Sequence, residues 1–176
     1  MSTQVTTGKV RLSFARLFTP ATAPGSDTPK YSTSVLVDKN DKVTIAKINA
    51  AVEEAKEVGK AKWGGKIPPK LKTPLRDGDE EKPDDPNYAG KMFFNCSSTK
   101  RPGIVDKDLN PILDPEEVYS GCYARVAINL YPYDSNGNRG IAAGLNHVQK
   151  LADGERFGGG ISVEAAFSDD TDDILG

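Results

Sequence analysis

The chain has 176 residues, which is enough for one domain with a well-buried core and too few for two full domains. It is 37% hydrophobic and 27% charged, with 12 prolines and 17 glycines, a composition typical of a soluble globular protein with long loops. The sequence contains no apolar run of about 18 residues and no basic-then-apolar leader, so we expect a cytoplasmic protein that spans no membrane.

The net charge of −2 hides a strong segregation of charge along the chain. Residues 1–76 hold 14 lysines and arginines against 6 acidic residues, whereas residues 77–86 hold 1 against 6. The last 26 residues hold 1 basic residue against 7 acidic ones. Because the charge is not uniform, the first half of the chain can attract phosphates even though the whole chain is slightly acidic.

Alternating residues predict two strands at the start of the chain. Residues 9–18 form the first, with Val10, Leu12 and Phe14 expected on one face and Lys9, Arg11 and Ser13 on the other. A loop rich in proline, glycine, serine and threonine follows, and residues 30–37 resume a strand. From Lys42 the period becomes helical, which predicts a helix of about five turns that ends within residues 59–64 and packs its apolar stripe on a sheet.

A long segment without periodicity covers residues 64–86, and loops of this length are usually functional or disordered. Just before and within it, residues 60–72 place five lysines around Trp63, the only tryptophan. The lysines could contact phosphates while Trp63 stacks on a base, or the loop could be solubilising with Trp63 in the core. The acidic run at residues 77–85 lacks the spacing of a calcium loop and indicates a solvated loop.

The next strand, residues 91–97, sets Met92, Phe94 and Cys96 opposite Lys91, Phe93 and Asn95. A tight connection through Lys100 and Arg101 leads to a short strand at residues 104–106. Cys96 and Cys122 both fall in strand patterns without partners for a zinc site, so we expect buried reduced thiols. The only histidine, His147, is interpreted as a strand residue, and glycines 158–160 as a hinge. We expect no metal, no cofactor and no catalytic constellation.

The most informative strand is that of residues 121–134, because its two faces differ. One face carries Cys122, Ala124, Val126, Ile128 and Leu130, and the other carries Tyr123, Arg125, Asn129, Tyr131 and Tyr133. The polar face offers flat π surfaces, a cation and hydrogen-bonding groups, which an unstacked base requires. Alternatively, the tyrosines pack under a loop or an insertion.

An Asn136-Gly137 turn predicts a type I′ hairpin between this strand and a returning strand at residues 140–150. On the returning strand, Ile141, Ala143, Leu145 and His147 are expected on one face. Small residues such as Ala142 and Gly144 fall on the other face, beside the tyrosines, where they would leave room for a base.

The C-terminus places Asp169, Asp170, Asp172 and Asp173 next to Ile174 and Leu175. Such a segment cannot fold alone. It could compete with DNA for a basic groove of the same chain, offer its aliphatic residues to a partner, or be a solvated end.

Several motifs together resemble the bacteriophage single-stranded-DNA-binding protein family typified by the Enc34-type protein. The resemblance extends over about residues 7–167, and its most specific part lies between residues 119 and 146. The motifs that carry it are residues 119–133, 136–137, 140–146, 148–151, 63–66 and 74–79.

The resemblance implies a mainly β fold with one long helix, in the form of an oligonucleotide-binding (OB) barrel with a long loop insertion. It further implies a non-enzymatic phage protein of DNA replication or recombination, acting in the cytoplasm of the infected bacterial host. Residues 1–167 would form the DNA-binding domain and residues 168–176 an acidic tail. The tail ends in Ile174-Leu175-Gly176, where single-strand binders often place an aromatic residue, so the identity of its partner stays open.

We therefore predict a sequence-tolerant binder of single-stranded DNA. Its tail would compete with DNA or recruit replication or recombination proteins. The alternatives are a strand-annealing recombination mediator and a structural or adaptor protein whose tyrosine face meets another protein. Oligomeric state, including a homo-oligomer, and preference for DNA over RNA stay open. The predicted interface residues are Lys9, Arg11, Trp63, Lys91, Phe93, Lys100, Arg101, Tyr123, Arg125, Tyr131, Tyr133 and Arg139.

Overall fold

A computed structural model describes residues 2–22 and 24–157, so the predicted hinge at residues 158–160 and the acidic tail lie outside the described residues. Within these ranges no helix is long and apolar enough to cross a membrane. The elements are β1 (Gln4–Thr6), β2 (Val10–Ala21), β3 (Lys30–Asp38), α1 (Lys42–Gly59), β4 (Arg76–Asp77), α2 (Gly78–Glu81), the 3₁₀ turn η1 (Pro86–Tyr88), β5 (Lys91–Ser98), β6 (Gly103–Val105), the 3₁₀ turn η2 (Pro115–Glu117), β7 (Tyr123–Ser135) and β8 (Asn138–Ala152).

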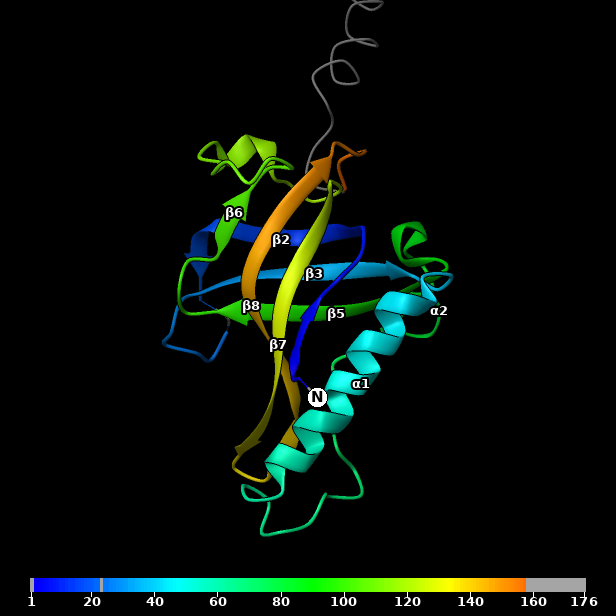
Figure 1. Ribbon diagram of the computed structural model, residues 1–176, viewed down its shortest axis with the longest axis vertical. Helices are drawn as coiled ribbons and strands as arrows, with labels where there is room; N and C mark the ends of the chain where they lie inside the picture. Colours follow the sequence, from blue (N-terminus) through cyan, green and yellow to red (C-terminus); the bar gives the residue numbers. More distant parts are fainter. Residues whose placement is uncertain (1, 23, 158–176) are drawn as a thin grey trace, which may run out of the picture.

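The strands close into a ring. Hydrogen bonds connect β2, β3, β5, β8 and β7 in that order, and β7 pairs back with β2. Neighbours in the ring are antiparallel except β5 and β8, which run parallel over two residue pairs. Figure 1 shows β7 and β8 crossing in front of β2, β3 and β5. The ring is a mainly β, OB-like fold with one long helix, as predicted, although the short β2–β7 and β5–β8 contacts make it an imperfect barrel.

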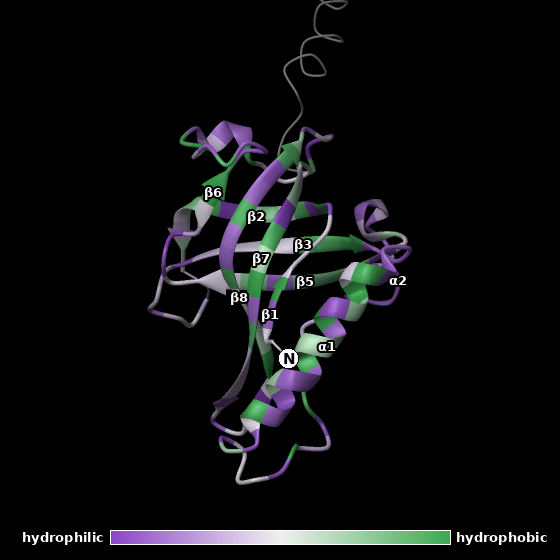
Figure 2. Ribbon diagram, in the orientation of Figure 1, coloured by the Kyte–Doolittle hydropathy of each residue, from purple (hydrophilic) through white to green (hydrophobic). Residues whose placement is uncertain are grey.

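The core of the ring comes from the alternation of the strands. The predicted inward face of residues 122–130, which include the first part of β7, is buried throughout. Both cysteines are free and buried, and burial raises the pKa of the Cys96 thiol to about 12. Helix α1 occupies the predicted range, with Asp41 accepting a hydrogen bond from Thr44 N at 3.1 Å as its N-cap. Figure 2 shows that apolar and polar residues alternate along α1. The middle of its predicted apolar stripe, Ile48, Val52 and Ala55, is buried, whereas Val58 at its end is 57% exposed. The helix contacts β7 and β1.

The predicted side-chain directions are wrong in part of β2 and part of β8, because each strand contains a β-bulge. In β2 the pairing with β3 shifts between Ser13 and Arg16, and Phe14, with φ of 50°, is 62% exposed instead of sharing the core face. In β8 the pairing with β7 shifts beside His147, which is exposed, while Val148 is buried in its place. An extra residue in one strand reverses the alternation beyond it, so period-2 reasoning fails after each bulge.

The segment between α1 and β5 is more ordered than its sequence predicted. It contains β4 and α2, and Asp77 caps α2 by accepting a hydrogen bond from Asp79 N. The ammonium group of Lys39 lies 2.8 Å from the Asp77 carboxylate and 2.7 Å from that of Asp79. Its hydrogen bonds hold the pKa of both carboxyl groups below their ordinary value. Part of the acidic run is therefore attached to the β3–α1 turn rather than fully solvated.

Candidate nucleic-acid interface

A groove of about 410 Å³ crosses the outer face of β2, β3 and β5. It is open to solvent at its centre and combines aromatic, basic and small polar side chains. Those that line it are Phe14, Arg16, Ser32, Thr33, Ser34, Arg76, Lys82, Tyr88, Phe93 and Asn95.

The floor of the groove follows from strand register. Ser34 of β3 is paired with Ser13 of β2 on one side and with Asn95 of β5 on the other. The Ser34 hydroxyl donates a hydrogen bond to Asn95 Oδ1. One row along, Ser32 is paired with Arg16 and Ser97. Short hydroxyl and amide side chains keep the centre of this face low and able to form hydrogen bonds.

Basic side chains flank this floor. Arg16 stands on the β2 side, and no ion pair engages it within the part of the chain that the structure describes. Arg76 and Lys82 stand on the opposite side; Arg76 Nε lies 3.7 Å from Glu81 Oε1, a long contact between exposed groups. Cations on both sides of a polar floor give a positive potential along the groove, which attracts a phosphate backbone.

Phe14 supplies an exposed aromatic ring at the β2 end of the groove. The bulge and the positive φ turn this side chain out of the core, where the preceding Leu12 remains fully buried. Bulges next to functional sites commonly re-aim a side chain in this way. The sequence pattern did not predict this exposure of Phe14, although it held one signal. Leu12 and Leu17 are five positions apart and fall on opposite faces of a regular strand, so burying both in one core requires a break in the alternation.

A second groove of about 270 Å³ continues the first around the ring. The two share Ser32, Arg76 and Asn95, and the second adds Lys72 with the predicted residues Tyr131 and Tyr133. Tyr131 is 38% exposed and is paired with Ala142, and Tyr133 is paired with Gly140, so the tyrosines do lie beside the small residues of β8 as predicted.

Tyr123 does not share this groove. It lies at the opposite end of β7, with Lys9 Nζ at 4.7 Å and the Arg11 guanidinium at 5.1 Å from its ring centroid. Arg11 donates hydrogen bonds to the carbonyl oxygens of Gly121 and Glu155, both at 2.8 Å. Arg11 therefore serves first to hold the chain that follows β8, a role that the sequence pattern did not reveal.

Two predicted aromatic residues have no free face for a base. Trp63 is 4% exposed, and its Nε1 donates a hydrogen bond to the carbonyl oxygen of Tyr133 at 3.1 Å, so the core interpretation of Trp63 is correct and stacking on it is not. Phe93 is 3% exposed and packs edge-to-face against Tyr88 at 5.1 Å. Both support the groove from beneath: Trp63 positions the backbone of Tyr133, and Phe93 forms one end of the floor.

The remaining predicted cations are dispersed. Lys91 pairs with Asp38 at 3.2 Å and Arg139 with Asp134 at 3.1 Å. Arg125 is exposed, and its Nε donates a hydrogen bond to the carbonyl oxygen of Thr7 at 3.0 Å. Lys100 and Arg101 line a separate pocket on the β1, β7 and β8 side. These residues lie outside the groove that contains Tyr131.

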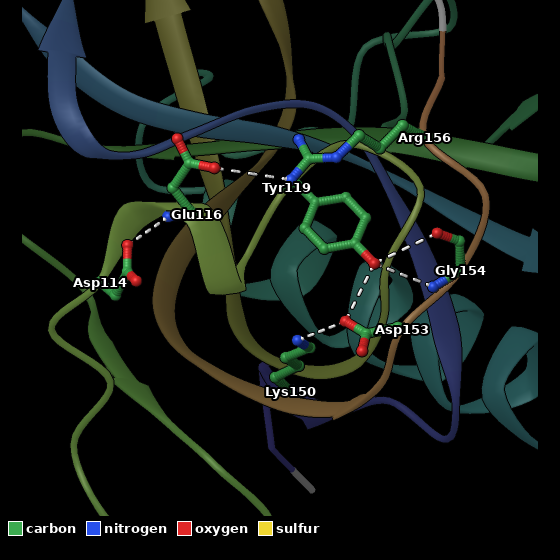
Figure 3. A network of polar contacts seen from close by, with 7 residues as sticks. All are labelled: Asp114, Glu116, Tyr119, Lys150, Asp153, Gly154 and Arg156. Carbon is green, nitrogen blue, oxygen red and sulfur yellow. Dashed lines mark hydrogen bonds and ion pairs between the residues drawn. The ribbon is translucent and has the colours of Figure 1, made fainter. Parts of the chain in front are cut away.

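The chain that follows β8 is anchored by contacts to Tyr119 (Figure 3). The Tyr119 hydroxyl donates a hydrogen bond to Asp153 at 3.0 Å and accepts one from Gly154 N at 3.1 Å. Lys150 lies 2.7 Å from Asp153, and this hydrogen bond holds the pKa of the Asp153 carboxyl below its ordinary value. The Arg156 guanidinium stacks over the Tyr119 ring at 4.1 Å.

Phe157 then packs against Leu36, Tyr88 and Phe93, under the Arg11 guanidinium at 4.3 Å. Because Tyr88 and Phe93 also line the groove, the last described residue lies at the groove rim.

Comparison with known proteins adds a direct relationship. A family model described as "Enterobacter phage Enc34, ssDNA-binding protein" matches residues 3–175. A putative protein, p50, of Acyrthosiphon pisum secondary endosymbiont phage 1 is 34% identical over 171 residues, which cover 91% of this chain and 90% of that protein.

Solved structures agree with this relationship. The single-stranded DNA-binding protein from bacteriophage Enc34 in complex with ssDNA is similar with a TM-score of 0.77 and 27% identity, over 88% of this chain and 89% of that chain. The single-stranded DNA binding protein gp2.5 of bacteriophage T7 has a TM-score of 0.62 at 18% identity, over 98% of this chain and 94% of that one. The likeness to gp2.5 is one of fold.

Proposed function

Because the chain belongs to the family of phage single-stranded-DNA-binding proteins represented by that of Enterobacter phage Enc34, we propose that it binds single-stranded DNA without strong sequence preference. The function is binding without catalysis. It would serve DNA replication or recombination in the cytoplasm of the infected host.

The observation that carries the proposal is the continuous groove from Phe14 to Tyr131. It joins two exposed aromatic rings by a polar floor flanked by Arg16 and Arg76. Stacking platforms combined with a basic track are the two features that bind single strands with little regard to sequence. The groove also lies on β3 and β5, the second and third strands of the ring, which is the face that OB folds use for oligonucleotides.

The groove sets the expected length of the bound strand. A path from Phe14 to Tyr131 crosses from β2 over β3, β5 and β8 to β7. Four inter-strand spacings of about 4.8 Å give a path of about 19 Å. This suits a site at the lower end of the range for one OB fold, about four nucleotides.

The acidic tail is proposed to compete with DNA for this groove. Support comes from the position of its root, because Phe157 packs at the groove rim. The chain from Phe157 to Asp169 can extend at most about 40 Å, so the four aspartates stay at high effective concentration near the basic residues. The same tail would recruit replication or recombination proteins when DNA displaces it. In this division residues 1–167 form the binding domain and residues 168–176 the tail.

The test is a titration of fluorescently labelled dT oligomers at two salt concentrations, followed by anisotropy. We expect binding that weakens linearly in log affinity with log salt. A strand-annealing mediator would additionally assemble on DNA, which light scattering on the same samples detects. An absence of binding to dT at low salt would refute the proposal and favour the adaptor alternative, in which the tyrosine face contacts a protein.

A further inference from the structure

Apart from the two connected grooves, a basic pocket of about 420 Å³ lies on the side of the ring formed by β1, β7 and β8. It is distinct from the groove and is reached where β5 leaves β8 and the chain turns toward β6. The polar and basic side chains in it include Gln4, Ser98, Lys100, Arg101, Asn146 and His147.

The two cations of this pocket differ from several others on the chain, which form ion pairs. Lys91, Arg139 and Arg76 each face a carboxylate. Neither Lys100 nor Arg101 has a carboxylate within 4.0 Å among residues 2–22 and 24–157. An unpaired cation can neutralise an external anion without first losing an internal partner.

Side-chain contacts fix the residues that line the pocket. Lys100 N donates a hydrogen bond to Ser98 Oγ at 3.0 Å, and the Arg101 guanidinium lies 5.6 Å from the ring centroid of Phe18. His147 stands directly over Gly103, where an added Cβ would lie 2.6 Å from its Nδ1. Apart from this imidazole, none of the described residues that line the pocket is aromatic, so it suits a phosphate backbone better than a base.

One glycine separates the pocket from the groove. The groove reaches Ser97, Ala142 and Ala143, and the pocket begins at Ser98 and Leu145. Between them lies Gly144, paired with Ser97, on the same outward face as Tyr131. A Cβ added to Gly144 would lie 3.6 Å from Tyr131 Cε1. Because Gly144 has no side chain, nothing projects from the surface at this position between the groove and the pocket.

We propose that this pocket is a second phosphate-binding subsite for the same DNA strand, reached over Gly144, so that a strand longer than the groove bends around β8. The inference rests on the proposed function, and it adds that the affinity depends on the length of the DNA strand. Short oligomers occupy the groove alone, and longer ones gain affinity from Lys100 and Arg101.

The experiment compares dT oligomers of 4, 8, 12 and 16 nucleotides for the wild type and a Lys100→Ala/Arg101→Ala variant. We expect unchanged binding of the 4-mer, roughly tenfold weaker binding of the 16-mer, and a salt slope for the 16-mer that is shallower by about 1.4, since each phosphate contact to a single strand contributes about 0.7. A Lys47→Ala/Lys107→Ala variant removes two exposed lysines elsewhere and controls for net charge.

A second variant, Gly144→Val, keeps both cations but raises a side chain between the two sites. The added Cβ makes only ordinary contacts, 3.5 Å to Asn129 O and 3.6 Å to Tyr131 Cε1, and urea unfolding of the variant checks that its γ-methyl groups are accommodated. We expect a loss for the 16-mer that exceeds any loss for the 4-mer, because the new side chain also lies beside Tyr131 of the groove.

Equal losses at all lengths, or no loss beyond the Lys47→Ala/Lys107→Ala control, would overturn the second subsite while leaving groove binding intact. Failure of the wild type to bind any length would instead refute the proposed function itself.

Discussion

Replacing Phe14 by alanine tests the groove at the residue that the bulge exposes. Its ring is 62% exposed, so less than half of it is buried in the free protein. Since full burial of a phenylalanine stabilises by about 1.5–3 kcal/mol, Phe14→Ala should lower the free energy of unfolding by about 1 kcal/mol or less. Stacking of one base on an aromatic ring is worth about 1–3 kcal/mol, so the Kd for dT oligomers should rise about 5- to 150-fold.

A second substitution separates stacking from backbone strain. Phe14 has φ of 50°, in the left-handed region that costs an L-residue roughly 1–2 kcal/mol but that glycine adopts freely. Phe14→Gly should therefore be more stable than Phe14→Ala, by about 1 kcal/mol, and equally weak in DNA binding. Phe14→Tyr should retain most of the affinity.

The assay is anisotropy with labelled dT oligomers, together with urea unfolding of each variant. Leu113→Ala is the control, because Leu113 is an exposed apolar residue, at 80%, that does not line the groove. A Phe14→Ala variant that binds DNA like the wild type would show that no base stacks on Phe14. The same conclusion would follow if DNA affinity rose and fell with the free energy of unfolding across the alanine and glycine variants.

Four further results are expected. Tyr131→Ala should weaken dT binding about tenfold or more with little change in stability, because the ring is a stacking platform at the other end of the groove. Arg16→Ala should make the log affinity versus log salt slope shallower by about 0.7, because one phosphate contact is lost. Deletion of residues 169–176 changes the formal charge from −2 to +2 and should tighten binding, most at low salt. Lys39 lowers the pKa of the Asp79 carboxyl, so the ionised carboxylate stabilises the fold above about pH 3.8, and this contribution is lost as the pH falls through the lowered pKa. Lys39→Met should therefore reduce the dependence of the free energy of unfolding on pH below about pH 3.8.

Each of these has a contrary outcome. Unchanged affinity of Tyr131→Ala would move the binding face away from β7. An unaltered salt slope for Arg16→Ala would remove that residue from the phosphate track. Equal affinity of truncated and full-length protein at about 50 mM salt would leave the tail as a partner-docking peptide or a solvated end. Parallel acid unfolding curves for Lys39→Met and wild type would show that its ion pairs do not contribute.

The sequence alone determined the elements whose signals are local. The helical period begins at Lys42, and α1 begins there as well. Asn136-Gly137 predicted a type I′ turn, and both residues have positive φ, 52° and 88°, in a hairpin whose strands pair from Ser135 and Asn138 onward. The two faces of β7 were likewise evident, because side-chain direction in a regular strand depends only on position along the chain.

Only the tertiary structure decided which residues meet. Arg16, Asn95 and Arg76 come from three separate strands, and their approach depends on β2, β3, β4 and β5 pairing in one register. Phe14 lies outside the core because a bulge inserts a residue into β2. Trp63 is not available for stacking because its buried indole donates a hydrogen bond to the carbonyl oxygen of Tyr133. Strand pairing, bulges and buried hydrogen bonds depend on partners distant in the chain, and period-2 alternation contains no information about those partners.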